Sequence, residues 1–212
     1  LDLQGSDNVS LLASNDPGIE KLDLPGIHNR RDAWLVVEAV ERITGQPKEA
    51  ITKILGRFPG TSRRMEEIRP GLFSDYAHTP EKIIGGLGVA LDIAKKRNKR
   101  VVVVYEPLTN RRQHFMKDDY KNCFDGASKV YWVPSYLARE DPDQPILTPE
   151  DLISRLDDPS IAVPASPNEV LWNDISRELG DSAIVVCMSG GGGWSLDEWL
   201  RGQVLNQSAP LN

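Results

Sequence analysis

The chain has 212 residues, of which 40% are hydrophobic and 26% charged, and its formal net charge is −6. These proportions predict a globular protein that folds in water around one large or two modest cores. The acidic excess argues against a nucleic-acid partner, because no basic surplus is available to displace phosphate counterions. No apolar run approaches the roughly 20 residues that span a bilayer, so we expect no membrane partner.

The first residue, Leu1, is not a methionine, and the residues after it lack the pattern of a signal peptide. We therefore interpret Leu1 as a cut end, either engineered or proteolytic. Two cysteines, Cys123 and Cys187, lie far apart in apolar stretches. This pattern predicts two buried thiols in a reducing cytoplasm rather than a disulfide framework.

The first part of the chain predicts a strand over residues 8–12, a turn over 16–18 and two helices. Apolar residues recur at helical spacing over residues 29–44, and Gly45 follows. A second helix is predicted over residues 47–55. A helical pair of this size cannot close a core by itself, so we expect it to be the end of a larger domain.

From residue 63 onward strands and helices alternate. Strands are predicted over residues 63–68, 72–76, 101–105, 129–133, 160–163 and 183–188, and helices over 80–97, 111–124, 149–156, 167–179 and 194–205. This rhythm predicts an α/β fold, with an open, Rossmann-like and mostly parallel sheet that carries helices on both faces. We place the domain boundary after residue 66, which gives domains of residues 1–66 and 67–212.

Three polar clusters lie at the ends of predicted elements. They are Gly26-Ile27-His28-Asn29, Gly60-Thr61-Ser62-Arg63-Arg64 and Asp75-Tyr76-Ala77-His78-Thr79-Pro80. Polar side chains at such positions indicate chemistry rather than packing. The third cluster follows a strand and opens a helix, where open α/β sheets bind ligands and a helix N-terminus favours anions.

In this order and spacing the clusters resemble the ATP-dependent Mur ligases of peptidoglycan precursor synthesis, over the back half of such an enzyme. The resemblance implies the helical end of a truncated ATPase domain, followed by a Rossmann-like domain. It also implies that a nucleotide-sugar carboxylate becomes an acyl phosphate, which the amine of an amino acid attacks. ATP and Mg would be held mainly by a P-loop, and UDP-N-acetylmuramate by an N-terminal domain. The chain has no Gly-x-x-x-x-Gly-Lys-Ser/Thr run, so we expect it to be inactive alone.

The resemblance assigns adenine binding to the first cluster. The family's Gly-x-His-Asn-x-x-Asn-Ala segment matches the eight residues from Gly26, so His28 and Asn29 are expected adenine contacts. Asp32 replaces the second Asn of that segment; it can accept from the adenine amino group but cannot donate to a ring nitrogen. By spacing alone, Asn29 reads instead as a helix N-cap.

The other two clusters resemble the family's hinge and ribose-binding segments. Arg64 matches the second Arg of Phe-x-Gly-x-x-Arg-Arg-Phe-Glu, and is expected to bind the nucleotide and act in catalysis. The alternative is that the two adjacent arginines are either exposed to solvent or paired with nearby glutamates such as Glu66 and Glu67. Asp75 is expected to hold the ribose and His78 to face the reacting groups, although a capping role for His78 is also open.

The segment Glu106-Pro107-Leu108-Thr109-Asn110-Arg111-Arg112 follows a buried strand, at the edge where an amino acid would dock. The family's tripeptide-recycling ligase has a Glu-Pro-Arg-Ser-Asn pattern there, and its alanine-adding ligase has Gln-Pro-His-Arg-Tyr-x-Arg. The expected substrate contacts are Glu106, Asn110, Arg111 and Arg112. Leu108 cannot hold a carboxylate, so one of the two arginines would do so. The alternative is a solvated helix N-terminus.

The run Gly190–Gly193 lacks the Lys and Ser/Thr of a P-loop, and predicts close backbone approach to a substrate or another domain. With three histidines and two distant cysteines, no metal site is expected within the chain. The resemblance favours an L-alanine-adding ligase, with the tripeptide-recycling ligase as its rival and the diaminopimelate- or lysine-adding ligase third. A non-catalytic nucleotide- or amino-acid-binding module is the alternative of another class, and the departures at Asp32, Leu108 and the four-glycine turn favour it.

Overall fold

The structure is a computed structural model that describes residues 12–58 and 60–208. The chain divides into two compact units, residues 1–59 and 60–212. The division falls a few residues before the boundary that the sequence predicts. The predicted strand 8–12 lies, apart from its last residue, outside the described residues.

The first unit is a pair of helices with a short 3-10 helix. Its elements are η1 (Pro17–Lys21), α1 (Ile27–Thr44) and α2 (Lys48–Leu55). Its small core consists of the buried side chains Ile19, Leu22, Trp34, Val37 and Ile51. The prediction of two helices is therefore confirmed.

The start of α1 differs from the prediction. Gly26 is the N-cap and has a φ of 83°, a left-handed value that favours glycine. The side chain of Asn29 donates from Nδ2 to the carbonyl oxygen of Pro25 at 2.8 Å. The interpretation of Asn29 as the N-cap is therefore wrong, because this residue already lies inside the first turn.

The second unit is built on one six-stranded sheet. Its strands are β1 (Glu66–Arg69), β2 (Leu72–Asp75), β3 (Arg100–Glu106), β4 (Lys129–Trp132), β5 (Ala162–Pro164) and β6 (Ala183–Ser189). They pair in the order β1-β2-β6-β3-β4-β5. Only β1 runs antiparallel to its neighbour; every other pairing is parallel. The predicted mostly parallel sheet is confirmed.

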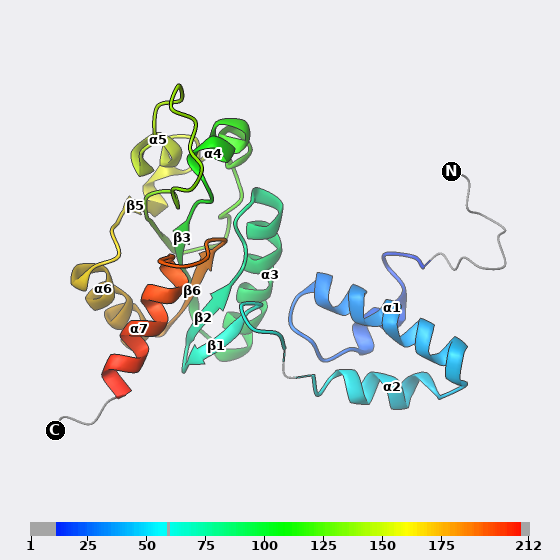
Figure 1. Cartoon of the computed structure of the whole chain (residues 1–212). Helices are drawn as coiled ribbons and strands as arrows, with labels where there is room; N and C mark the ends of the chain where they lie inside the picture. Colours follow the sequence, from blue (N-terminus) through cyan, green and yellow to red (C-terminus); the bar gives the residue numbers. More distant parts are fainter. Residues whose placement is uncertain (1–11, 59, 209–212) are drawn as a thin grey trace. The chain divides into compact units, whose positions relative to one another are not determined.

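Helices cover both faces of this sheet, as predicted (Figure 1). They are α3 (Pro80–Arg97), α4 (Asn110–Met116), α5 (Pro149–Ile153), α6 (Glu169–Gly180) and α7 (Leu196–Ser208). One hydrophobic cluster includes Ile83 of α3 and Leu152 of α5. The other includes Ile175 of α6 and Leu200 of α7. Two separate clusters mean that the central strands are buried on both sides, which explains their continuous apolar sequences.

The helix predicted over residues 111–124 is much shorter in the structure. It ends at Met116 and is followed by the 3-10 helix η2 (Lys117–Asp119). The hydroxyl of Tyr120 donates to Oε1 of Gln113 at 2.6 Å and shares a 2.8 Å hydrogen bond with the hydroxyl of Tyr105. Burial of Tyr120 and of this network turns the chain toward the sheet and ends the helix.

The strand predicted over residues 63–68 begins only at Glu66. Arg63 and Met65 have φ values of 55° and 49°, in the left-handed region that no β-strand uses. The residues before β1 therefore form a tight turn, closed by a hydrogen bond from the Arg64 amide to the Thr61 carbonyl oxygen at 3.0 Å. This turn brings two arginines to the end of the sheet.

The prediction of two buried thiols without a disulfide is confirmed, since Cys123 and Cys187 are both buried and free. Over residues 12–58 and 60–208, no helix is long and apolar enough to cross a membrane.

Candidate functional site

The carboxyl ends of three neighbouring strands form the candidate site. In the parallel register Asp75 of β2 pairs with Met188 of β6, and Glu106 of β3 pairs with Ser189. The polar segments that follow these strands therefore meet at one edge of the sheet. Open parallel sheets bind their ligands at this edge.

Asp75 holds the turn that precedes β1. Its Oδ2 accepts from the amide of Met65 at 2.9 Å, and its Oδ1 accepts from the amide of Ala77 at 2.8 Å. The side chain is nearly buried, and burial raises the pKa of this carboxyl even though the two amides act in the opposite direction. Asp75 thus fixes the backbone just before β1, next to Arg64, and just after β2, next to His78.

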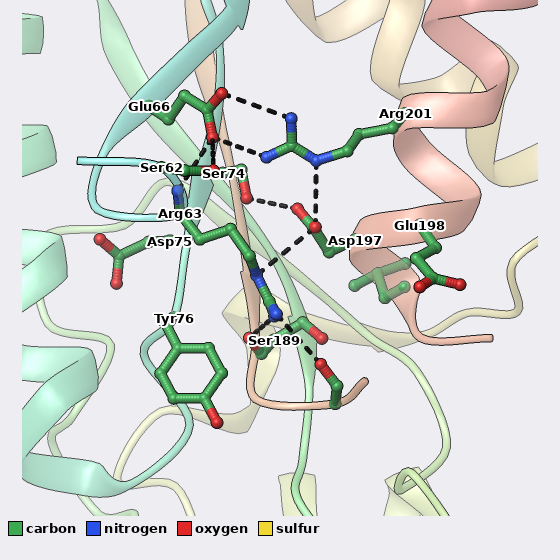
Figure 2. A network of polar contacts seen from close by, with 12 residues as sticks. Ser62, Arg63, Glu66, Ser74, Asp75, Tyr76, Ser189, Asp197, Glu198 and Arg201 are labelled. Carbon is green, nitrogen blue, oxygen red and sulfur yellow. Dashed lines mark hydrogen bonds and ion pairs between the residues drawn. The ribbon is translucent and has the colours of Figure 1, made fainter. Parts of the chain in front are cut away.

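Arg63 ties this turn to the glycine-rich loop, a contact that the sequence did not predict (Figure 2). Its guanidinium donates to the carbonyl oxygens of Ser189 at 2.7 Å and Gly191 at 3.2 Å. Its Nε lies 3.4 Å from Oδ2 of Asp197. No sequence signal could have found these partners, because they lie more than 120 residues away along the chain.

Asp197 is the centre of a polar network that Figure 2 shows. The hydroxyl of Ser74 donates to Oδ1 of Asp197. Nε of Arg201 donates to Oδ2 of Asp197 at 3.1 Å, and its Nη2 donates to Glu66 at 2.7 Å. The Arg201 guanidinium, together with the Arg63 amide, lowers the pKa of Glu66 to about 2. Arg64 is exposed, as the alternative allowed, but it does not pair with Glu66 or Glu67, which pair with Arg201 and Arg97.

His78 is held with one ring nitrogen free of backbone contacts. Its Nδ1 lies 2.8 Å from the carbonyl oxygen of Tyr76, which can only accept, so Nδ1 carries the proton. Nε2 therefore keeps its lone pair, with Nζ of Lys82 at 3.5 Å. Burial lowers the pKa of His78, and the nearby charges of Lys82, Arg112 and Arg64 lower it further. This imidazole is neutral near pH 7 and can accept a proton at Nε2.

The glycine run makes close approaches to side chains of the same unit. A β-carbon on Gly190 would lie 2.4 Å from Cγ of His78, and one on Gly191 would lie 2.7 Å from Cβ of Ser195. Gly192 and Gly193 have open space around them. The first two glycines are therefore required for packing against His78 and the start of α7.

The side chains of Glu106 and Asn110 form hydrogen bonds that fix the segments around the site. Glu106 accepts from the Ser189 hydroxyl at 2.6 Å and from the Leu196 amide at 3.0 Å, and burial raises its pKa. Asn110 accepts from the Leu147 amide at 2.8 Å and donates to the Pro145 carbonyl oxygen at 3.1 Å. Both side chains are thus hydrogen-bonded within the protein, and any contact with a substrate must use atoms that already form these hydrogen bonds.

A pocket of about 540 Å³ opens beside this edge. Its lining comprises Leu108, Thr109, Arg111, Arg112, Phe115, Tyr136, Ala138, Arg139, Gly190, Gly191 and Gly192. The pocket therefore contains three guanidinium groups and no carboxylate. Glu140, next to it, accepts only from the backbone amides of Ala138 and Arg111.

None of the pocket's arginines forms an ion pair with a carboxylate in the described part of the chain. The structure thus brings the predicted residues Arg111 and Arg112 together with Arg139, which sequence reasoning missed because it lies in an irregular segment. Three guanidinium groups that form no ion pair within the described residues, in a protein of net charge −6, favour an anionic ligand.

The predicted adenine contacts belong to the first unit. His28, Asn29 and Asp32 are exposed within the first two turns of α1. The only hydrogen bond of these three side chains within the described residues is the one from Asn29 to Pro25. They are therefore free to contact a ligand from solvent. Among residues 12–58 and 60–208, no group of three His, Cys, Asp or Glu side chains could hold a metal ion.

The fold and this edge define a Rossmann-like α/β domain with an arginine-lined pocket. No family model matches the chain. It is 31% identical over 144 residues to the UDP-N-acetylmuramate–L-alanine ligase of Rickettsia felis, a match that covers 65% of this chain and 30% of that enzyme. The enzyme of the same name from Brucella ovis is also 31% identical, over 140 residues.

Solved structures agree on the fold. The UDP-N-acetylmuramate–alanine ligase of Thermotoga maritima has a TM-score of 0.60 at 20% identity, covering 88% of this chain and 39% of that one. The folylpolyglutamate synthase of Mycobacterium tuberculosis, solved with ADP and AMPPCP, has a TM-score of 0.51 at 19% identity, over 90% of this chain and 42% of that one. The chain therefore resembles Mur ligases in sequence and in fold, and it spans less than half the length of these relatives.

Proposed function

We propose that the chain is the C-terminal part of an ATP-dependent UDP-N-acetylmuramate–L-alanine ligase-like enzyme of peptidoglycan precursor synthesis, working in the cytoplasm. Residues 1–66 would end its ATPase domain, and residues 67–212 would carry the acceptor amino acid. The relatives at 31% identity, which bear that name, support this proposal. The observation that carries it is the pocket with three arginines that form no ion pair within the described residues, beside a neutral His78.

The acceptor's carboxylate binds to Arg111 or Arg112 in this proposal. Both arginines are exposed and line the pocket, and a guanidinium can hold a carboxylate through two parallel hydrogen bonds. Arg112 is the stronger candidate, because its charge also lowers the pKa of His78 and it therefore lies on the side of the reacting groups. Glu106 and Asn110 shape the pocket by fixing the segments around it.

His78 is the proposed base. Amide formation requires the attacking amine to lose a proton, and the lone pair on Nε2 of His78 can accept it. The lowered pKa keeps this imidazole neutral, so the lone pair is available near pH 7. Gly190, packed against the ring, fixes its position relative to the pocket.

Arg64, Asp75 and the exposed residues His28, Asn29 and Asp32 are the proposed nucleotide contacts. Asp75 has spare lone pairs on both oxygens and Arg64 has an exposed guanidinium, so the two fit a ribose and a phosphate respectively. In this proposal ATP supplies the phosphoryl group that activates the donor carboxylate. The Mg ion binds outside these residues. The carboxylate belongs to UDP-N-acetylmuramate, which binds outside these residues as well.

A recycled tripeptide is the second candidate acceptor, ahead of diaminopimelate or lysine. The Glu106-Pro107 and Asn110 pattern favours it, and a pocket of about 540 Å³ has more room than an alanine fills. A non-catalytic amino-acid-binding module remains the alternative of another class. These candidates differ in what the pocket binds and in whether any reaction follows.

Calorimetry with L-alanine and with the tripeptide, on the 212-residue chain and its Arg112→Ala variant, tests the acceptor site. Loss of a charge-assisted bidentate contact should weaken the bound acceptor by about tenfold to a hundredfold. Lys53→Ala, in the first unit, is the control. Arg111→Ala is measured in the same way. If both arginine variants bind L-alanine and the tripeptide as tightly as the unchanged chain does, the acceptor role of this pocket is contradicted.

Phosphate release tests the expected inactivity of the chain alone. With ATP, UDP-N-acetylmuramate and amino acid present, release should stay at background. Turnover by these residues alone would mean that the ATPase chemistry has been assigned to the wrong part of the enzyme.

A further inference from the structure

A network of buried hydrogen bonds connects β3 with the wall of the arginine-lined pocket. The hydroxyl of Tyr105 lies 2.8 Å from that of Tyr120, and Tyr120 donates to Oε1 of Gln113 at 2.6 Å. Nε2 of Gln113 donates to the carbonyl oxygen of Leu108 at 2.7 Å. Tyr105, Tyr120 and Gln113 are fully buried, whereas Leu108 lines the pocket. The network therefore reaches from the interior of the domain to the pocket.

The direction of each hydrogen bond in this network is fixed. Gln113 uses Nε2 for Leu108, so its Oε1 faces Tyr120 and can only accept. Tyr120 therefore donates its one proton to Gln113 and accepts the proton of Tyr105. The carbonyl oxygen of His78, 3.3 Å from the Tyr105 hydroxyl, is the more distant acceptor for that proton. Burial raises the pKa of both tyrosines, so their protons stay in place at neutral pH.

Packing alone does not account for these polar groups. The rings of Tyr105 and Tyr120 pack against Phe124 and Trp132 within one hydrophobic cluster, where phenylalanine rings would fill almost the same space. Burying polar groups costs free energy unless each of them is hydrogen-bonded. A fully bonded network, in turn, makes the surrounding segments rigid and favours one arrangement of them. The segment at the outer end of this network is the one that begins with Leu108.

Leu108 lies just before the start of α4, where the helix lacks an ordinary cap. Thr109 is the N-cap, and within the described residues its side chain forms no capping hydrogen bond. Gln113, one turn into the helix, reaches back to the Leu108 carbonyl oxygen instead. Arg111 and Arg112 lie between these two residues and line the pocket. The position of both guanidinium groups therefore depends on how Gln113 holds the start of the helix.

We propose that Tyr120 and Gln113 are positioning residues, which place Leu108, Arg111 and Arg112 for binding of the acceptor. The inference rests on the proposed function, which assigns the acceptor's carboxylate to one of these arginines. Tyr120 and Gln113 are fully buried and act through the hydrogen bond to Leu108. Loss of the Tyr120 hydroxyl leaves Oε1 of Gln113 without its donor, so the amide is no longer fixed in the orientation that holds Leu108.

Tyr120→Phe in the 212-residue chain tests the proposal, with Tyr131→Phe as its matched control. Tyr131 is also buried and its hydroxyl donates to Glu178 at 3.1 Å, but it belongs to the other hydrophobic cluster. Calorimetry with L-alanine and with the tripeptide should show binding weakened by about threefold to tenfold in Tyr120→Phe. Binding should be unchanged in Tyr131→Phe. Unchanged binding in Tyr120→Phe, or equal weakening in both variants, overturns the proposal.

A double variant separates positioning from stability. Tyr120→Phe/Gln113→Leu removes the donor and the acceptor together, so no buried amide oxygen is left unsatisfied. Urea unfolding should therefore show most of the stability lost in Tyr120→Phe restored. Leu108 still lacks its donor, so binding of L-alanine and of the tripeptide should stay weak. Recovery of binding together with stability would mean that the network acts only on folding, which refutes the positioning role.

Backbone amide NMR tests the network in samples without any ligand. The signals of residues 108–112 should move in Tyr120→Phe and stay in place in Tyr131→Phe. Unmoved signals in the first variant would show that the network does not hold this segment, against the proposal. If the unchanged chain binds neither L-alanine nor the tripeptide, the proposed function fails at this pocket, and these signals alone decide whether the network positions the segment.

Discussion

Arg63 and Asp197 face each other across the candidate site, with Nε of the arginine 3.4 Å from Oδ2 of the aspartate. The first residue lies in the turn before β1 and the second in the first turn of α7. Because Arg63 also binds the carbonyl oxygens of Ser189 and Gly191, this pair joins the beginning and the end of the second unit at the glycine-rich loop. Several predictions about stability and loop position depend on this junction.

Asp197→Ala should strongly destabilise the second unit. The change leaves the guanidinium groups of Arg63 and Arg201 without their shared, nearly buried carboxylate, and such a loss costs roughly 3–5 kcal/mol. Urea unfolding followed by circular dichroism measures it. Glu198→Ala, an exposed neighbour in the same helical turn, is the control and should cost about 1 kcal/mol or less. Similar costs for both variants would show that the network contributes little.

Gly190→Ala should displace the imidazole of His78. The new methyl group would lie 2.4 Å from Cγ of the ring, and forced overpacking costs roughly 1–3 kcal/mol. Gly192→Ala is a matched control two residues away, where nothing lies within 4 Å. Histidine NMR should report a shifted His78 only in the first variant. If both variants keep the His78 signals of the parent chain, the ring is not fixed by the loop.

The ion pair between Glu66 and Arg201 should make stability depend on acid. The folded pKa of Glu66 is about 2, below its usual value of 4.5, so its contribution is present above pH 4.5 and is lost as the pH falls toward 2. At pH 7, Glu66→Gln should lower the free energy of unfolding by roughly 1–3 kcal/mol. This difference should shrink over that acid range. A constant difference from pH 7 to 2 would contradict the shifted pKa.

The two thiols should be unreactive in the folded chain. Cys123 and Cys187 are buried, and burial raises the pKa of both, so neither offers an accessible thiolate near pH 7. Ellman's reagent should label them only after denaturation. Rapid labelling under native conditions would indicate local opening of β6 or of the segment that follows η2.

The sequence by itself determined the α/β class, the mostly parallel sheet and the helices on both faces. Continuous apolar runs such as residues 101–105 and 183–188 have one stable arrangement, in which helices cover both sides of the strand. The motif around Asp75 and His78 likewise predicted the edge of the sheet where the candidate site lies, since it follows a strand and opens a helix.

Only the tertiary structure decided which side chains meet at that edge. Arg63 meets Asp197 through the pairing of β2 with β6 and the left-handed turn at Arg63. The early end of α4 could not be predicted from the local sequence either, because it depends on the burial of Tyr120 and on its hydrogen bond to Gln113. Periodicity reports which face of an element is buried, whereas long-range contacts and local backbone strain depend on the whole folded unit.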